Sequence, residues 1–143
     1  MLKSIALAAV IAVSGGGAAF AQNQTGAALV DAIFAQAEQE ILNGSAAAGR
    51  ARGVAEDGGS ADHVFNLQAG KSYLVIGVCD ESCSDLDLAL FGVSGEDLGS
   101  DYELDDAPMV MFQASRSGQY RVNAMMASCD AALCHYGVRI YEQ

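Results

Sequence analysis

The chain has 143 residues, of which 18 are acidic and seven are basic, and its formal net charge is −11. This acidic balance argues against nucleic acid and anionic membrane surfaces as partners, because both are bound through basic patches. The length suffices for one domain with a modest core, and the surplus of carboxylates leaves cation binding open.

The first residues have the pattern of a secretory signal peptide. Lys3 gives a positive start, residues 5–13 form an apolar run too short to span a bilayer, and residues 19–21 (Ala-Phe-Ala) precede Gln22. We predict that residues 1–21 are removed; a retained membrane anchor is the alternative. The processed chain then has six basic and 18 acidic residues and a net charge of −12. We expect a periplasmic or secreted protein with no membrane insertion after cleavage.

Residues 22–49 predict an amphipathic helix followed by a linker. Apolar residues recur at helical spacing from residue 27 to 43, Thr25 is a candidate N-cap, and small residues at 45–49 favour a linker. The polar face lacks lysine and arginine, which argues against a membrane-surface helix. We expect the apolar face to pack on the rest of the chain or on a second copy, as a homo-oligomer through residues 27–43; a foreign partner is the alternative. The apolar face consists of Leu29, Val30, Ile33, Phe34, Ala37 and Ile41.

From residue 50 to residue 143 the hydrophobic period changes to two, which is typical of strands. Turn residues separate the segments at short intervals, with no helical pattern between them. We predict a mainly β fold, an antiparallel jelly-roll-like β-sandwich of about six to eight strands. The expected strands cover residues 54–56, 64–68, 72–78, 85–91, a short piece near 102, 109–114, 119–127 and 135–141.

Four cysteines form two close pairs along the chain, Cys79 with Cys83 and Cys129 with Cys134. An even count in an exported chain predicts two disulfides, and sequence alone allows three connectivities. We favour pairing within each close pair, because each pair brackets a turn of small and acidic residues that a short staple can fix.

Two other cysteine chemistries compete with this interpretation. The cysteines could bind zinc together with His63 and His135. The segment from Cys129 to His135 also resembles a haem-attachment motif stretched by two residues, with Met125 or Met126 as an axial ligand. Both are weaker interpretations, since the spacings differ from those of the usual motifs.

Four segments resemble the bacterial pre-peptidase C-terminal domain. They are Phe65–Tyr73 (FNLQAGKSY), Ser84–Phe91 (SDLDLALF), Ser117–Val122 (SGQYRV) and Tyr136–Ile140. The resemblance covers about residues 50 to 142 and implies a jelly-roll-like sandwich that serves as a non-catalytic accessory or binding module of exported proteins. Some members of this family bind calcium and a polymeric substrate. The N-terminal helix and the two cysteine pairs depart from the family pattern.

Carboxylates are the candidate site chemistry. The resemblance and the clustering of acids favour calcium, which takes six to eight oxygen ligands. Our candidate ligands are Asp85, Asp87, Asp105 and Asp106, two paired acidic sites that could converge. No segment has the twelve-residue pattern of a calcium-binding helix–loop–helix, and turn formation or solubility would also account for the aspartates.

We expect no enzymatic activity and no other cofactor. His63 and His135 are the two residues that titrate near neutrality without a shifted pKa, and neither lies in a catalytic motif. The chain has no tryptophan for a sugar groove. The sequence therefore predicts an exported binding module for an unknown protein, polymer or cation. The alternative is a structural or envelope-associated protein that self-assembles through the N-terminal helix.

Overall fold

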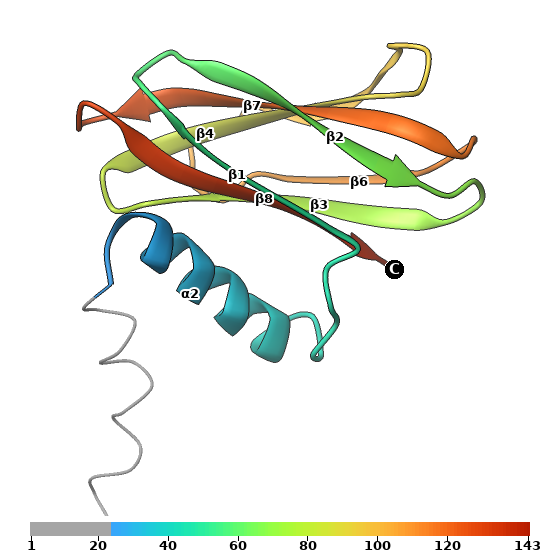
Figure 1. Cartoon of the computed structure of the whole chain (residues 1–143), viewed down its shortest axis with the longest axis horizontal. Helices are drawn as coiled ribbons and strands as arrows, with labels where there is room; N and C mark the ends of the chain where they lie inside the picture. The colour runs from blue at the N-terminus through green and yellow to red at the C-terminus, as the bar shows by residue number, and fades with distance from the viewer. Residues whose placement is uncertain (1–23) are drawn as a thin grey trace, which may run out of the picture.

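The computed structural model describes residues 24–143, and the predicted signal peptide lies outside this part. The described residues form one helix and eight strands (Figure 1). The elements are α2 (Gly26–Glu40), β1 (Gly49–Ala55), β2 (Ser60–Leu67), β3 (Ser72–Cys79), β4 (Cys83–Phe91), β5 (Asp97–Asp101), β6 (Met109–Gln113), β7 (Gly118–Cys129) and β8 (Cys134–Glu142). No helix among these residues is long and apolar enough to cross a membrane.

The strands form two four-stranded antiparallel sheets. The first, which we call the covered sheet, has the order β1-β8-β3-β6; the second, the open sheet, has the order β2-β7-β4-β5. Alternate side chains of both sheets point into one core, as on β4, where Leu86, Leu88 and Leu90 are buried. The predicted antiparallel β-sandwich is therefore confirmed.

Helix α2 covers the outer face of the covered sheet (Figure 1). Val30 and Phe34 are buried there in a second apolar cluster with Ile76, Val78 and Tyr141. Gly137 of β8 lies under the helix, where an added Cβ would come within 2.8 Å of Phe34 and 2.9 Å of Val30. The apolar face of the helix thus packs on its own chain, one of the two expected modes; the homo-oligomer stays a prediction.

Both ends of α2 differ from the prediction in detail. The side chain of Thr25 makes no capping hydrogen bond; instead Glu81 of the β3–β4 turn accepts one from the first helical N–H, that of Gly26, at 2.9 Å. The helix ends at Glu40, three residues early, and Asn43 (φ 52°) and Gly44 (φ 79°) complete the stop in the left-handed region.

Buried charges fasten α2 to the covered sheet. Arg139 is 8% exposed, and its guanidinium donates to Glu38 at 2.8 Å and lies 4.3 Å from the ring centroid of Phe34. The Tyr141 hydroxyl donates to the same carboxylate at 2.9 Å. Burial raises the pKa of Glu38, but the hydrogen bonds from Tyr141 and Arg139 outweigh burial and lower it overall. Burial and Glu38 together raise the pKa of Tyr141 to about 12.

Strand β1 is longer than the sequence predicts. We expected a linker at residues 45–49 and a short strand at 54–56, whereas β1 spans Gly49–Ala55 and pairs along its whole length with β8. Its outward side chains at positions 50 and 52 are arginines that pair with Glu38 and Asp31 of the helix. A strand of small inward and charged outward residues carries little hydrophobic signal, so its existence depends on the partners on either side.

Candidate functional site

The four cysteines form the disulfides Cys79–Cys83 and Cys129–Cys134. These are the pairings that the spacing favours, and Cys83 and Cys129 are register partners on β4 and β7, so both disulfides lie at the same end of the sandwich. With every described cysteine oxidised, neither zinc binding nor haem attachment has a thiol to use.

The acids of the predicted calcium site lie at one edge of the sandwich. Asp85 and Asp87 share the outer face of β4, and the loop from residue 102 to 108 runs beside that strand. The backbone N–H of Leu86 donates to the carbonyl of Asp105 at 2.9 Å, which fixes the loop there. We name this region the acidic edge. It consists of Asp85, Asp87, Asp101, Glu103, Asp105 and Asp106.

Asp87 is the most constrained carboxylate of the acidic edge. Its residue is 7% exposed, and Oδ1 is buried without a hydrogen-bond partner; Oδ1 of half-buried Asp85 is likewise unpartnered. Burial raises the pKa of Asp87, and repulsion from Asp85, Asp101 and Asp105 raises it further. A buried carboxylate without a partner is destabilising, so Asp87 is a group that a bound cation would stabilise.

The structure brings three of the four predicted ligands together but does not assemble a complete metal site. Asp85, Asp87 and Asp105 are neighbours. Asp106 is exposed, and its backbone carbonyl oxygen lies 3.8 Å from the sulfur of Cys79. Among residues 24–143, no three acidic, histidine or cysteine side chains are positioned to hold a metal ion. The arrangement supplies charge and unpartnered oxygens, and water would have to complete the coordination shell.

Asp101 belongs to the acidic edge but was not among the predicted ligands. Its Oδ1 accepts from the N–H of Glu103 at 3.1 Å and its Oδ2 from that of Met109 at 2.8 Å. The first bond forms a turn at the start of the β5–β6 loop, and the second joins the two ends of the loop. In the sequence, Asp101 is one of several acidic residues between positions 97 and 106. No sequence pattern distinguishes the aspartate that closes the loop from the acids beside it.

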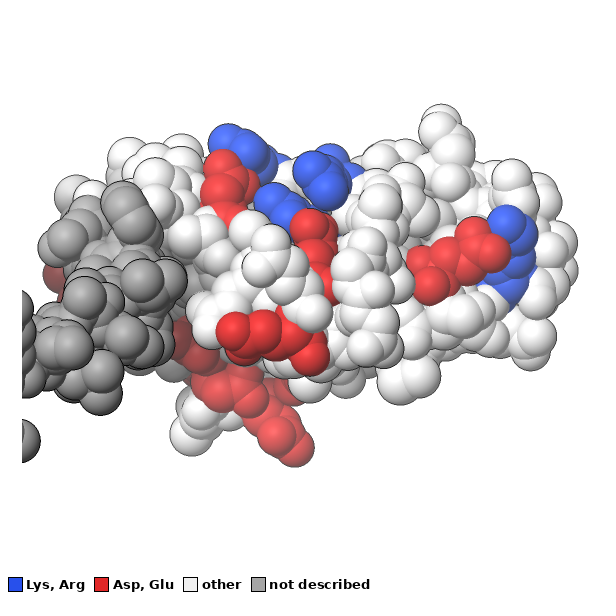
Figure 2. Space-filling view, turned by 90° about the horizontal axis from the view of Figure 1, so that it is seen from below, with Lys and Arg blue, Asp and Glu red and all other residues white. Residues whose placement is uncertain are grey.

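Every lysine and arginine in the described part of the chain is paired with a carboxylate outside the acidic edge. In Figure 2 the blue side chains lie beside red ones, whereas a red group at the lower edge of the view has no blue beside it. The acidic edge is therefore a concentration of uncompensated charge. The pairs are Arg50–Glu38, Arg52–Asp31, Lys71–Glu142, Arg116–Glu96, Arg121–Asp62 and Arg139–Glu38.

The half-buried His63 joins the two sheets. Its Nε2 lies 2.8 Å from the hydroxyl of Tyr136 across the sandwich. Burial lowers the pKa of His63, and the neighbouring Asp62 opposes that shift. A Cβ at Gly53 would collide with the Tyr136 ring, so glycine at that position makes room for the contact. The arrangement indicates a structural role for His63.

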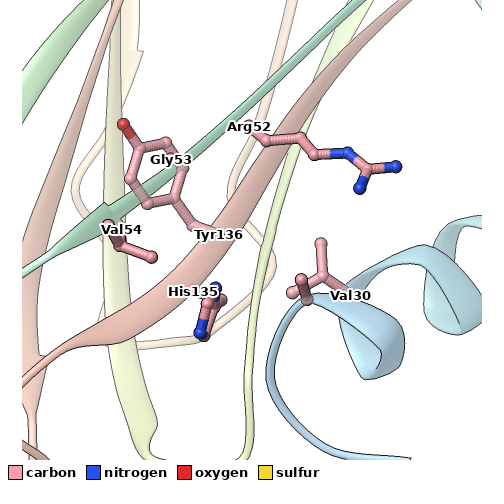
Figure 3. A pocket seen from close by; sticks show the side chains of 7 residues that line it. Val30, Arg52, Gly53, Val54, His135 and Tyr136 are labelled. Atoms are coloured by element: carbon pink, nitrogen blue, oxygen red, sulfur yellow. The ribbon is translucent and has the colours of Figure 1, made fainter.

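A pocket of about 230 Å³ lies between the start of α2, β1 and β8 (Figure 3). Its walls are mainly apolar, and Arg52 and His135 supply the polar side chains. Sequence reasoning missed this pocket, because it forms between the helix and a strand of which only the last residues were predicted. Its lining residues are Ala27, Val30, Arg52, Gly53, Val54, His135 and Tyr136.

The described residues thus form a β-sandwich with helix α2 on one sheet and the acidic edge beside β4. No family model matches the sequence, and no curated protein matches it in sequence. Among the solved structures that are similar to this chain, two with different roles show the same fold.

The first is PliG of Aeromonas hydrophila, a periplasmic inhibitor of g-type lysozyme, with a TM-score of 0.50 and 13% identity over 71% of this chain and 90% of that one. The second is the pre-peptidase C-terminal domain of a Bacillus anthracis collagenase, with a TM-score of 0.51 and 14% identity over 66% of this chain and 89% of that one. The predicted resemblance to the pre-peptidase C-terminal domain is thus confirmed at the level of the fold.

Proposed function

We propose that the protein is an exported, non-catalytic binding module whose acidic edge binds calcium. The likeness to two small sandwiches supports the first half of the proposal: one of them is an enzyme inhibitor, and the other is a domain of a collagenase. Two disulfides support an oxidising compartment, in which such bonds persist. In addition, the contact of His63 with the Tyr136 hydroxyl across the sandwich supports a structural role for that histidine.

The main support for calcium binding at the acidic edge is the unpartnered carboxylate of Asp87. Two adjacent acids with buried unpartnered oxygens and no lysine or arginine beside them are held together against their own repulsion. A divalent cation would replace this repulsion by attraction, and it prefers carboxylate and carbonyl oxygens at such a position. The residues that would hold it are Asp85, Asp87 and Asp105, with Asp106 close along the chain.

Thermal melts in millimolar calcium and in chelator test whether the acidic edge binds calcium. A cation that binds the folded state stabilises it by about 2.7 kcal/mol at a hundred times its dissociation constant. We expect calcium to raise the melting temperature of the native protein, to have little effect on Asp87→Asn, and to act fully on Glu40→Gln, which removes one exposed charge from the helix. Identical melts of the native protein in calcium and chelator would refute the site.

The alternative, self-assembly through the helix, has one observation in its favour. Ile41 follows the last residue of α2 and is 73% exposed. Of the other residues of the apolar face, Val30 and Phe34 are buried and the rest are partly buried. Light scattering of the native protein and Ile41→Ser decides the matter without uncovering the sheet. An assembly that Ile41→Ser dissolves supports the alternative, and a monomer in both cases supports the binding module.

A further inference from the structure

Exposed apolar side chains accompany the acidic edge. Tyr102 is 60% exposed, Leu104 89%, Met109 58% and Met111 70%. All four lie within ten residues, in a loop and strand whose ends are joined by the hydrogen bond from Met109 to Asp101. Methionine adapts its shape to a partner, and exposed methionines are common on binding surfaces. Met109 and Met111 lie two positions apart on β6 and so share one face of that strand, and Tyr102 and Leu104 lie in the loop that precedes it.

The two exposed methionines of β6 lie beside the apolar outer face of the covered sheet. Met109 and Met111 are register partners of Ile76 and Leu74 on β3, and these two belong to or pack against the apolar cluster under α2. Strand β6 is also the edge of its sheet. An edge strand offers backbone groups for pairing with another chain, and side-chain positions alternate along the added strand.

The negative charge of this surface favours a positively charged partner. From Asp97 to Met111 the chain has five acidic residues and no basic one. No lysine or arginine of residues 24–143 pairs with the acidic edge. Asp87, 7% exposed with an unpartnered Oδ1, adds a buried negative charge to the same edge. An apolar strip beside uncompensated carboxylates complements a segment that alternates apolar and cationic side chains.

We propose that strand β6 and the acidic edge dock an extended segment of a partner protein, in which lysine or arginine alternates with large apolar residues. The apolar side chains of the partner lie on Met109 and Met111, and its cations face Glu103, Asp106 and their neighbours. The inference rests on the proposed binding function and names the chemistry of its partner. It does not depend on calcium.

The direct test is binding of short synthetic peptides to the processed protein in chelator, measured by calorimetry. The probe alternates lysine and leucine; one matched peptide replaces leucine by serine, and another replaces lysine by glutamate. We expect the lysine–leucine peptide to bind at least roughly tenfold more tightly than either matched peptide. Its binding should weaken as sodium chloride rises from about 0.05 to about 0.5 M, because salt screens exposed charges.

Two pairs of variants locate the contact. The double variant Glu103→Gln, Asp106→Asn should lower the affinity for the lysine–leucine peptide roughly fivefold. The double variant Glu40→Gln, Glu56→Gln removes the same amount of charge from other surfaces and should not lower it. Met111→Ser should weaken binding of the same peptide, whereas Val64→Ser on β2 of the open sheet, also an exposed position (57% against 70% for Met111), should leave it unchanged.

Several outcomes would overturn the inference. They are equal binding of the lysine–serine and lysine–leucine peptides, equal losses in test and control variants, and no binding of any peptide. A dimer of the protein alone that Met111→Ser dissociates would show the surface to be a contact between copies, which also contradicts a foreign partner. Calcium melts are scored separately, so peptide binding without a calcium effect refutes the cation site and leaves this inference standing.

Discussion

The helix-covered face and the acidic edge handle charge and apolar surface in opposite ways. Under α2, Arg139 is buried, but Glu38 accepts hydrogen bonds from it and from Tyr141. At the acidic edge, Asp87 is buried to the same degree, and its Oδ1 has no partner. The apolar residues differ in the same sense, because Phe34 is 1% exposed and Met111 is 70% exposed.

This difference indicates that the helix-covered face stabilises the fold, whereas the acidic edge is suited to binding. A covered apolar face with paired charges stabilises the fold and offers nothing to a ligand. Unpaired carboxylates beside exposed apolar side chains lower the stability of the isolated protein, and a complementary ligand relieves that instability. The comparison therefore predicts large losses of stability from changes under the helix, and unchanged or increased stability from changes at the acidic edge.

Phe34→Ala should have the largest effect. The side chain fills the space between α2 and Gly137 and carries the guanidinium of Arg139 on its ring. Truncating a buried phenylalanine costs about 3–5 kcal/mol, measurable by urea denaturation. Ile41→Ala, at the exposed end of the same helix, should change the free energy of unfolding by less than about 0.5 kcal/mol. Equal effects of the two would mean that the helix does not depend on its contact with the sheet.

Glu38→Gln should come next. The change leaves the 8% exposed Arg139 with Asp31, at 3.4 Å, as its remaining carboxylate partner. We therefore expect a loss of up to about 3 kcal/mol, the cost of breaking a buried ion pair from one side. Because the folded pKa of Glu38 is lowered, its contribution is present above its ordinary pKa of 4.5 and is lost as pH falls through the folded value. Arg139→Met in the same chain should restore much of the loss. A double variant no better than Glu38→Gln would contradict the pairing.

Much of the fold can be predicted from the sequence, because its strands carry their own signal. Leu86, Leu88 and Leu90 recur at every second position, and this period of two alone puts Asp85 and Asp87 together on the other face. Strand β1 has no such signal, since its inward positions are small and its arginines are held by α2. The contact of the β5–β6 loop with β4 depends on a backbone hydrogen bond between Leu86 and Asp105, which no local pattern encodes. That contact decides which acids become neighbours.

Asp87→Asn should have the opposite sign to the helix variants. Its folded pKa is raised, so the ionised carboxylate destabilises the fold at neutral pH, and the penalty disappears as pH falls through the folded value. Replacing it by the neutral amide should stabilise the chelated protein at pH 7 by roughly 1 kcal/mol. The gain should shrink in acid, near the ordinary pKa of 3.8. Urea denaturation at both pH values measures it, and a loss of stability at pH 7 would contradict the unpartnered charge.

The smallest expected effect comes from His63, whose protonation should lower the free energy of unfolding at a higher pH than protonation of the carboxylates does. Burial lowers the folded pKa of His63 below its ordinary 6.5, so the unfolded chain takes up its proton first. Stability should therefore fall as pH drops from about 7 through the folded value, by less than about 1 kcal/mol near pH 5, because the ring is only half-buried. His63→Gln should remove this slope while leaving the carboxylate transitions of Glu38 and Asp87 at lower pH. His135→Gln is the matched control and should retain the slope. A slope that survives His63→Gln and disappears in His135→Gln would assign the transition to the pocket beside α2 instead of to the bond between the sheets.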